Sequence, residues 1–394
     1  MEYKIEFSGR ALNYSDDEIR IINDVAKNAD PLTQGPYLQN FEQNIKKYLG
    51  VDYAFGLTNG ASALELAAVL CRLKKGDEVI IPSHTYCATA IPFGRTGAKI
   101  VWADIDPETF VISESDIKNK VTNNTKVIVL VHLYGQACDM GPILKICSDN
   151  NIKLVEDCAQ SIGAKYKNKH VGSFGDFACF SLHAQKNITT LGEGGLLIVK
   201  DKLDASKVKG LRHNGHTSFG EREEYWKPAM TNVDLDIDGV WPFNYSMTEI
   251  QAALGSKLLE RLDNLNRQRI TRANIFIDEM SEYSELTFQN PEDEYENVRH
   301  LLPAKYYGSQ YGKCSHDLIS LLSKKYKIKT IVQYYPLNRY PLFKKMGFGH
   351  AKCPNSDNFF DNMISFPFHH WMSDKDFLYL IDSVKLSLNE LRES

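Results

Sequence analysis

Short apolar runs alternate with helical segments between residues 53 and 200, and this pattern restricts the possible folds more than any other feature. The runs have the length and composition of buried strands. They lie at 53–57, 77–82, 98–105, 124–132, 152–157, 176–181 and 196–200. Repeated strand–helix units predict a mostly parallel sheet covered by helices, with ligands bound at the carboxyl ends of the strands.

The turn after the first strand reads Thr58-Asn59-Gly60-Ala61-Ser62 and leads directly into an apolar helix. Such a turn leaves backbone N–H groups free at the helix N-terminus, where a phosphate can bind. The same residues also suit an ordinary Asn-Gly turn in which Ser62 caps the helix. The turn is therefore a candidate phosphate site, and the capping interpretation stays open.

Lys186 follows the strand at 176–181 and precedes Gly192, Gly194 and Gly195. A lysine at the end of a core strand reaches solvent or has a function, because burial of an ammonium group is costly. Asp157 and His132 also lie at strand ends. We therefore expect Ser62, His132, Asp157 and Lys186 to approach one another at one edge of the sheet.

This set of residues suits pyridoxal phosphate. The phosphate needs N–H and hydroxyl donors, the pyridine nitrogen needs an anion, and the aldehyde needs an amine that forms a Schiff base. Asp157 would supply the anion and Lys186 the amine. A helix-capping aspartate and a solvated loop lysine are the alternative interpretations.

The segments after residue 246 predict a smaller α+β lobe. We expect a long helix over 247–280 that is broken or kinked near Gly255, and we place the domain boundary inside it. Residues 1–264 then form a large cofactor-binding domain with an N-terminal helical segment, and residues 265–394 form a small C-terminal domain. Its predicted elements are strands at 300–307 and 328–336 and helices at 315–326 and 374–391. Residues 214–243 are polar and aperiodic, which predicts a long irregular loop.

The composition excludes several classes of protein. A net charge of −4 implies no general affinity for nucleic acid. The eight cysteines form no CxxC pair, which disfavours zinc sites and disulfide frameworks and suits reduced thiols in a cytoplasmic protein. The N-terminus lacks a signal-peptide pattern, and no apolar run has the length of a membrane span. We expect a cytoplasmic protein without a membrane or nucleic-acid partner.

The chain resembles the DegT/DnrJ/EryC1/StrS family of sugar aminotransferases, which are fold-type I pyridoxal-phosphate enzymes. The resemblance runs from about residue 30 to the end and rests on GPYLQNFE, TNGASALELA, GDEVIIPSHTYCAT, VHLYGQACDM, VEDCAQSIGA, FSLHAQKNITTLGEGG, MTEIQAALG, VQYYPLN and SFPFHH. It implies an α/β large domain like that of aspartate aminotransferase, a smaller C-terminal α+β domain and a homodimer with shared active sites.

The resemblance also implies roles for single residues. Lys186 forms the Schiff base and moves the proton, and Asp157 pairs with the pyridinium. Gln160 lies near the ring and Tyr86 stacks on it, with His84 as the alternative to Tyr86. The phosphate is held by Gly60, Ala61, Ser62 and Ser181, and by Asn244 of the neighbouring subunit. Tyr86 as a core residue and Gln160 as a backbone partner remain alternatives.

Three histidines have less specific roles. His183 suits packing or hydrogen bonding as well as catalysis. We expect His369 and His370 to form an exposed loop pair, and lining of the substrate mouth is the alternative. Many relatives carry an arginine at the position of Ser246 and a histidine at that of Asn338. An additional Leu191 lengthens the loop before GEGG. These departures prevent a direct transfer of substrate specificity from the family.

The implied activity is transfer of an amino group from an amino acid, expected to be L-glutamate, to a keto or aldehyde sugar. Pyridoxamine phosphate would be the intermediate form of the cofactor. The sugar would be nucleotide-linked, an oxo-octulosonate-type acid or an oxo-cyclitol, in lipopolysaccharide, other cell-surface polysaccharide or secondary-metabolite biosynthesis. The alternatives are a pyridoxamine-phosphate-dependent dehydratase or deoxygenase, in which histidine replaces the lysine, and a non-catalytic cofactor-binding regulator. A hydride-transferring dehydrogenase is disfavoured because no GxGxxG follows the early strands.

Overall fold

The computed structural model describes residues 2–216, 240–290 and 294–393. Most of the predicted irregular segment at 214–243 therefore lies outside the described residues. All eight cysteines are free thiols. In the described part of the chain, every helix is too short or too polar to cross a membrane.

A seven-stranded sheet in the order β1-β9-β8-β5-β4-β2-β3 forms the centre of the molecule. Its strands are β1 (Tyr53–Leu57), β2 (Glu78–Pro82), β3 (Lys99–Ala103), β4 (Thr125–Val131), β5 (Lys153–Asp157), β8 (Phe177–Ser181) and β9 (Gly195–Val199). The pairs among β3, β2, β4, β5 and β8 are parallel, while β9 runs antiparallel to both β8 and β1. The predicted mostly parallel sheet is confirmed, and β1, β5 and β8 end at the same edge.

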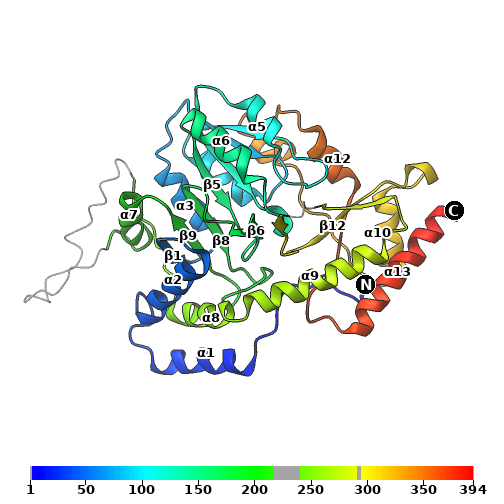
Figure 1. The fold of residues 1–394 in the computed structure, drawn as a ribbon, viewed down its shortest axis with the longest axis horizontal. Helices are drawn as coiled ribbons and strands as arrows, with labels where there is room; N and C mark the ends of the chain where they lie inside the picture. Colours follow the sequence, from blue (N-terminus) through cyan, green and yellow to red (C-terminus); the bar gives the residue numbers. More distant parts are fainter. Residues whose placement is uncertain (1, 217–239, 291–293, 394) are drawn as a thin grey trace, which may run out of the picture.

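Helices cover both faces of this sheet (Figure 1). Side chains of a strand alternate between the faces, so Ile128 and Leu130 of β4 join one core while Val127 and Val129 join the other. The first core includes side chains of α2 (Pro36–Leu49), α5 (Glu114–Lys120), α6 (Met140–Asn150) and α8 (Glu249–Leu259). The second includes side chains of α3 (Gly60–Leu70), α4 (Ile91–Arg95) and α7 (Lys202–Arg212). Burial on both faces explains why the strands read as continuous apolar runs.

The segment before α2 carries α1 (Asp16–Asn28), as predicted. Ser15 caps this helix in a capping box. The Ser15 hydroxyl accepts a hydrogen bond from the Glu18 N–H, and the Glu18 carboxylate accepts one from the Ser15 N–H. Glu18 also pairs with Arg261, at a Nε–Oε1 distance of 2.6 Å. The pair ties α1 to the junction of α8 and α9.

A third core lies in the lobe beyond α8 (Figure 1). Its sheet has the order β10-β12-β13, from β10 (Leu286–Phe288), β12 (Leu302–Tyr306) and β13 (Met363–Phe366). Its helices are α9 (Leu262–Glu279), α10 (Ser315–Lys324) and α13 (Asp374–Glu393), and Ile5 of the N-terminal segment packs with them. The division between residues 264 and 265 stays a prediction.

Short elements complete the described chain. They are β6 (Lys165–Tyr166), β7 (Lys169–His170), β11 (Tyr295–Glu296), α11 (Pro341–Lys345), α12 (Pro354–Asn362) and the 3-10 turns at Cys87–Thr89, Leu133–Gly135, Ser309–Tyr311 and Leu337–Arg339. The strand β11 pairs with β6, so a segment from beyond α9 joins the large lobe.

Two local predictions are wrong. The long helix breaks at Glu260–Arg261, between α8 and α9, and not at Gly255. Gly255 lies inside α8. A Cβ at this position would come within 2.7 Å of the Phe41 ring, so the glycine permits close packing of α8 against α2 and does not break the helix. Residues 328–336 form no strand; they contribute single bridges, such as that between Ile331 and Ser365, because the chain turns there to line the cavity described below.

Gly195 at the start of β9 permits the close approach of the turn after β1. A Cβ at Gly195 would lie 2.2 Å from the carbonyl oxygen of Asn59. We predict that Gly195→Ala lowers the free energy of unfolding by roughly 1–3 kcal/mol or more, because the clash is with backbone. Equilibrium unfolding in urea should show a lower midpoint for Gly195→Ala than for the wild type.

The matched control is Gly94→Ala in α4, where the added Cβ would meet only the flexible end of Ile100, at 3.4 Å. We expect that change to alter stability by less than about 1 kcal/mol. Equal unfolding midpoints for the two variants would contradict the proposed role of Gly195.

Candidate active site

A cavity of about 380 Å³ lies at the carboxyl ends of β1, β5 and β8. This volume is typical of small-molecule sites. Seven of the predicted site residues line it: Gly60, Ala61, Tyr86, Asp157, Gln160, Ser181 and Lys186. His183, Thr89 and Tyr334 line it as well, whereas Ser62, His132 and Asn244 are not among its lining residues.

The turn after β1 is closed on itself by a capping box. The Asn59 side chain accepts a hydrogen bond from the Ser62 N–H at 2.8 Å, and the Ser62 hydroxyl accepts one from the Asn59 N–H at 3.1 Å. Ser62 is buried and its hydroxyl is engaged within the turn, so the capping interpretation describes its side chain. The cap residue itself is Asn59.

Gly60 and Ala61 begin α3, so their N–H groups have no partner within the helix. A Cβ at Gly60 would lie 2.9 Å from the Cβ of Ser181, so the absent side chain keeps β8 close to this helix end. Two backbone N–H groups and a hydroxyl thus adjoin one part of the cavity. This donor set fits a phosphate group.

Asp157 at the end of β5 is held in orientation by two donors. The Thr89 hydroxyl donates to Oδ2 at 2.7 Å, and the Ala159 N–H donates to Oδ1 at 3.0 Å. Burial raises the pKa of Asp157 above its ordinary value, while the bond from Thr89 and the charge of Lys186 oppose the rise. A cationic ring nitrogen placed beside this oriented carboxylate would favour its ionised form and could pair with it.

Lys186 lies in the cavity wall, on a loop that two backbone segments of the same chain hold in place. The Ala184 N–H donates to Gly192 at 2.9 Å, and the Ala11 N–H donates to Ala184 at 3.0 Å. Burial lowers the pKa of Lys186 to about 8, against the attraction of Asp157. The structure therefore shows a partly buried amine of lowered pKa and not a solvated loop lysine.

Gln160, Tyr86 and Tyr334 also line the cavity. The Gln160 oxygen accepts from the Tyr134 N–H at 2.8 Å, and its amide donates to the Tyr334 hydroxyl at 2.9 Å. Tyr86 is 54% exposed, with its ring centroid 5.7 Å from that of Tyr334. Gln160 thus satisfies backbone and also positions Tyr334.

His84 is unsuited to the role considered as the alternative to Tyr86. It is buried, and its Nε2 pairs with the Tyr134 hydroxyl at 2.8 Å. Burial lowers the pKa of His84 to about 3, so the ring is neutral. Tyr86 lines the cavity and His84 lies in the core.

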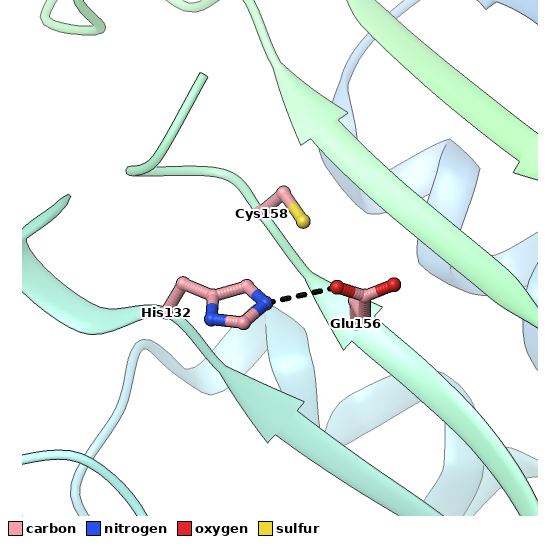
Figure 2. Close-up of side chains that lie close together, drawn as sticks. All are labelled: His132, Glu156 and Cys158. Atoms are coloured by element: carbon pink, nitrogen blue, oxygen red, sulfur yellow. Dashed lines mark hydrogen bonds and ion pairs between the residues drawn. The ribbon is translucent and has the colours of Figure 1, made fainter. Parts of the chain in front are cut away.

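His132 lies behind the cavity in a closed cluster with Glu156 and Cys158 (Figure 2). The Cys138 N–H donates to His132 Nδ1 at 3.0 Å, so the ring proton is on Nε2 and points at Glu156, 3.1 Å away. Glu156 also accepts the N–H groups of Gly172, Phe174 and Gly175. Because the imidazole nitrogens and both carboxylate oxygens are engaged, this cluster is structural and not a metal site.

Burial alone would raise the pKa of Glu156, but the bonds from His132, Gly172 and Gly175 hold that pKa below its ordinary value. Glu156 therefore stays ionised in the core. It anchors the strand end that carries Asp157.

The expectation for His369 is wrong. His369 is only 9% exposed and lines a second, smaller cavity, and His370 is half-buried. The ring of His369 stacks on that of Trp371, with centroids 3.8 Å apart. Packing between the aromatic rings of this turn explains the burial.

The three departures from the family pattern have ordinary local partners. Ser246 Oγ lies 3.1 Å from His213 Nδ1, and the Asn338 amide donates to Ala351 at 3.1 Å. Leu191 is exposed and left-handed, with φ of 62°, and its N–H donates to the Tyr14 hydroxyl at 3.2 Å.

Sequence reasoning missed Thr89 and Tyr334. The aromatic pair in the VQYYPLN motif was a usable signal for Tyr334. Thr89 carried none, since its partner Asp157 is 68 positions away.

The sequence model of the DegT/DnrJ/EryC1/StrS aminotransferase family matches residues 13–385. GDP-perosamine synthase of Escherichia coli O157:H7 is 32% identical over 352 residues, which cover 89% of this chain and 90% of that protein. Among solved structures, the putative sugar aminotransferase Spr1654 of Streptococcus pneumoniae in its apo form has 27% identity and a TM-score of 0.87, covering 99% of this chain and 98% of that one. Structures of Spr1654 in its pyridoxal-phosphate (PLP) and pyridoxamine-phosphate (PMP) forms match as well.

Helicobacter pylori PseC, an aminotransferase involved in the biosynthesis of pseudoaminic acid, has 25% identity and a TM-score of 0.87. The match covers 98% of this chain and all of that one, at 100%. The phosphate donors at α3, the carboxylate of Asp157 and the amine of Lys186 fit pyridoxal phosphate in this chain as well.

The lowered pKa of Lys186 predicts how fast the protein, once stripped of cofactor, takes up pyridoxal phosphate. The unprotonated amine attacks the aldehyde, so the uptake rate should rise about tenfold per pH unit below pH 8 and level off above it. Stopped-flow measurement of the visible band would check this. A rate that still climbs toward the pKa of an ordinary lysine would show that burial does not lower the pKa of Lys186.

Proposed function

The chain belongs to the DegT/DnrJ/EryC1/StrS aminotransferase family and is a pyridoxal-phosphate-dependent sugar aminotransferase, and we propose that it moves an amino group from L-glutamate to a nucleotide-linked keto sugar. The observation that carries the proposal is the meeting of Lys186, Asp157 and the N-terminus of α3 around one cavity. Lys186 also disfavours the dehydratase alternative, in which histidine replaces the lysine.

When bound, pyridoxal phosphate supplies an aldehyde that joins covalently to amines and a ring that withdraws electrons from the substrate carbon. The N–H groups of Gly60 and Ala61 and the Ser181 hydroxyl would hold the phosphate. Asp157, fixed by Thr89 and Ala159, would keep the ring nitrogen protonated. Tyr86 lines the cavity and would contact the ring.

Lys186 is the proton carrier of this proposal. An amine with a pKa of about 8 is close to neutrality, where a group both accepts and donates protons effectively. Its loop is held by bonds at Ala184, so the amine moves between nearby atoms without displacement of the backbone. In this proposal the Lys186 amine would take the proton from the substrate carbon that bears the amino group and would give it to the carbon of the cofactor's aldehyde.

Names among the relatives favour a nucleotide-linked substrate over a free oxo-octulosonate. They include GDP-perosamine synthase and a dTDP-3-amino-3,6-dideoxy-galactopyranose transaminase. We further propose a role in cell-surface polysaccharide synthesis in the cytoplasm, where eight free thiols would remain reduced.

The half-reactions can be separated by the visible band of the lysine-bound cofactor. L-Glutamate should remove the band, and a panel of GDP-, dTDP- and UDP-linked keto sugars, with oxo-octulosonate for comparison, should identify the acceptor that restores it. Lys186→Ala should lack the band and lose turnover by at least ~10²-fold. Lys200→Ala, at an exposed lysine, is the matched control.

A protein that keeps its band with every amino acid tested is not an aminotransferase. If Lys186→Ala turned over at the rate of Lys200→Ala, the role of Lys186 would be wrong.

We also propose a homodimer in which Asn244 reaches the partner's cofactor phosphate. Asn244 is exposed and lies beside His213, outside the cavity of its own chain. A polar residue presented outward near the sheet edge suits contact with a second copy.

Complementation tests this dimer. Asn244→Ala should weaken binding of pyridoxal phosphate by roughly tenfold or more, through the lost charge-assisted bond. In a heterodimer of Asn244→Ala with Lys186→Ala, one site regains both residues, so half of the sites should bind the cofactor with wild-type affinity. A heterodimer with only weak sites would contradict sharing.

A further inference from the structure

A second cavity, of about 60 Å³, adjoins the first on the other side of Lys186. Four residues line both: Gln185, Lys186, Gln333 and Tyr334. The remaining walls come from the N-terminal segment and from the lobe beyond α8. A ligand in the second cavity would therefore lie next to Lys186. Most of the walls around it come from other parts of the chain than those of the first cavity.

Its lining carries positive charge. Arg10 and Arg269 supply that charge, whereas burial lowers the pKa of His300 and of His369, so both rings are neutral at neutral pH. The lining residues that the structure describes include no aspartate or glutamate. An unopposed set of donors at a cavity wall favours an anion.

Arg269 supplies the buried charge. It is 3% exposed and its guanidinium lies 4.6 Å from the centroid of the Phe368 ring. Nε and Nη2 donate to the carbonyls of Arg299 and His300 at 3.1 and 2.6 Å. Carbonyl partners leave its positive charge uncompensated, and burial lowers the pKa of Arg269 only to about 10, so it stays charged at neutral pH.

Arg10 supplies the adaptable donors. Its Nε donates to the Leu12 carbonyl at 3.1 Å, and the next residue, Ala11, is bonded to the loop of Lys186 through Ala184. The Arg10 side chain is exposed at the mouth of the cavity, and Nε is its one nitrogen with a hydrogen-bond partner among the described residues, so Nη1 and Nη2 are open to solvent or to a ligand. A guanidinium held by one nitrogen keeps a free pair of donors for a carboxylate.

His369 adds an unpartnered polar atom to the cavity wall. Its Nδ1 is buried and has no hydrogen-bond partner among the described residues. A buried polar atom of this kind is costly unless a ligand or water satisfies it.

The size of the cavity selects among anions. One water molecule needs about 10–15 Å³ on this measure, so 60 Å³ holds a few heavy atoms. A carboxylate fits, whereas a sugar ring or a nucleotide diphosphate does not.

We propose that the second cavity is the subsite for a carboxylate of the amino-acid donor, bound by the free Nη groups of Arg10 with support from Arg269 and His369. The proposal rests on the aminotransferase function, which brings an amino acid to Lys186. It separates the two substrates in space: the donor's carboxylate lies on the side of the N-terminal segment, and the sugar occupies the larger cavity.

Calorimetric titration of the holoenzyme with glutarate tests the subsite, because glutarate is a dicarboxylate without a reacting amine. Arg10→Ala should raise the glutarate Kd roughly 10- to 100-fold, and Arg10→Lys should raise it less. Glutaramide, which is neutral, should bind neither protein. Arg20→Ala is the matched control, since Arg20 is an exposed arginine of the same segment that pairs with Asp17.

The half-reactions provide a second readout. In Arg10→Ala, the glutamate concentration that removes the visible band at half-maximal rate should rise by the same factor as the glutarate Kd. The sugar concentration needed to restore the band should be unchanged.

The subsite is overturned if glutamate bleaches the wild-type band and Arg10→Ala binds glutarate as the wild type does. It is also overturned if Arg10→Ala weakens the glutamate and sugar steps equally, which would mean that Arg10 only positions the loop of Lys186. A wild-type protein whose band survives glutamate contradicts the aminotransferase function itself, whatever the glutarate Kd.

Discussion

A partly buried amine near a buried carboxylate is the constraint on which the site depends. Burial lowers the pKa of Lys186 and raises that of Asp157, and each charge opposes the shift of the other. Such a pair persists only where the surrounding structure holds it. Thr89 and the Ala159 N–H hold the carboxylate, and the bonded loop around Ala184 holds the lysine.

The layer behind this pair is equally polar. The Glu156 carboxylate accepts hydrogen bonds from three backbone N–H groups and from the imidazole of His132. This one carboxylate therefore joins the loop at 172–175 to the ends of β4 and β5. Since Glu156 directly precedes Asp157, the direction of the site carboxylate follows from this anchoring. The adjacent acids have opposite tasks: Glu156 faces the core, and Asp157 faces the cavity.

Lys186 lies between cavities of different composition. The larger one combines backbone donors, a carboxylate and tyrosines, while the smaller one is lined by arginines and histidines without a described acid. An aminotransferase binds an amino acid and a sugar in turn at one amine. The N-terminal segment serves both lobes, because Ile5 packs with the third core and Ala11 bonds the lysine loop.

The sequence by itself determined the parallel sheet and placed Gly60, Ala61, Asp157 and Lys186 at its edge, because strand alternation and turn chemistry are local properties. Only the tertiary structure decided which residues complete the site. Thr89 meets Asp157 across 68 positions and Tyr334 meets Gln160 across 174. The engagement of Ser62 in its own turn, the burial of His369 and the absence of a strand at 328–336 likewise depend on contacts made after the chain has folded, which no local pattern encodes.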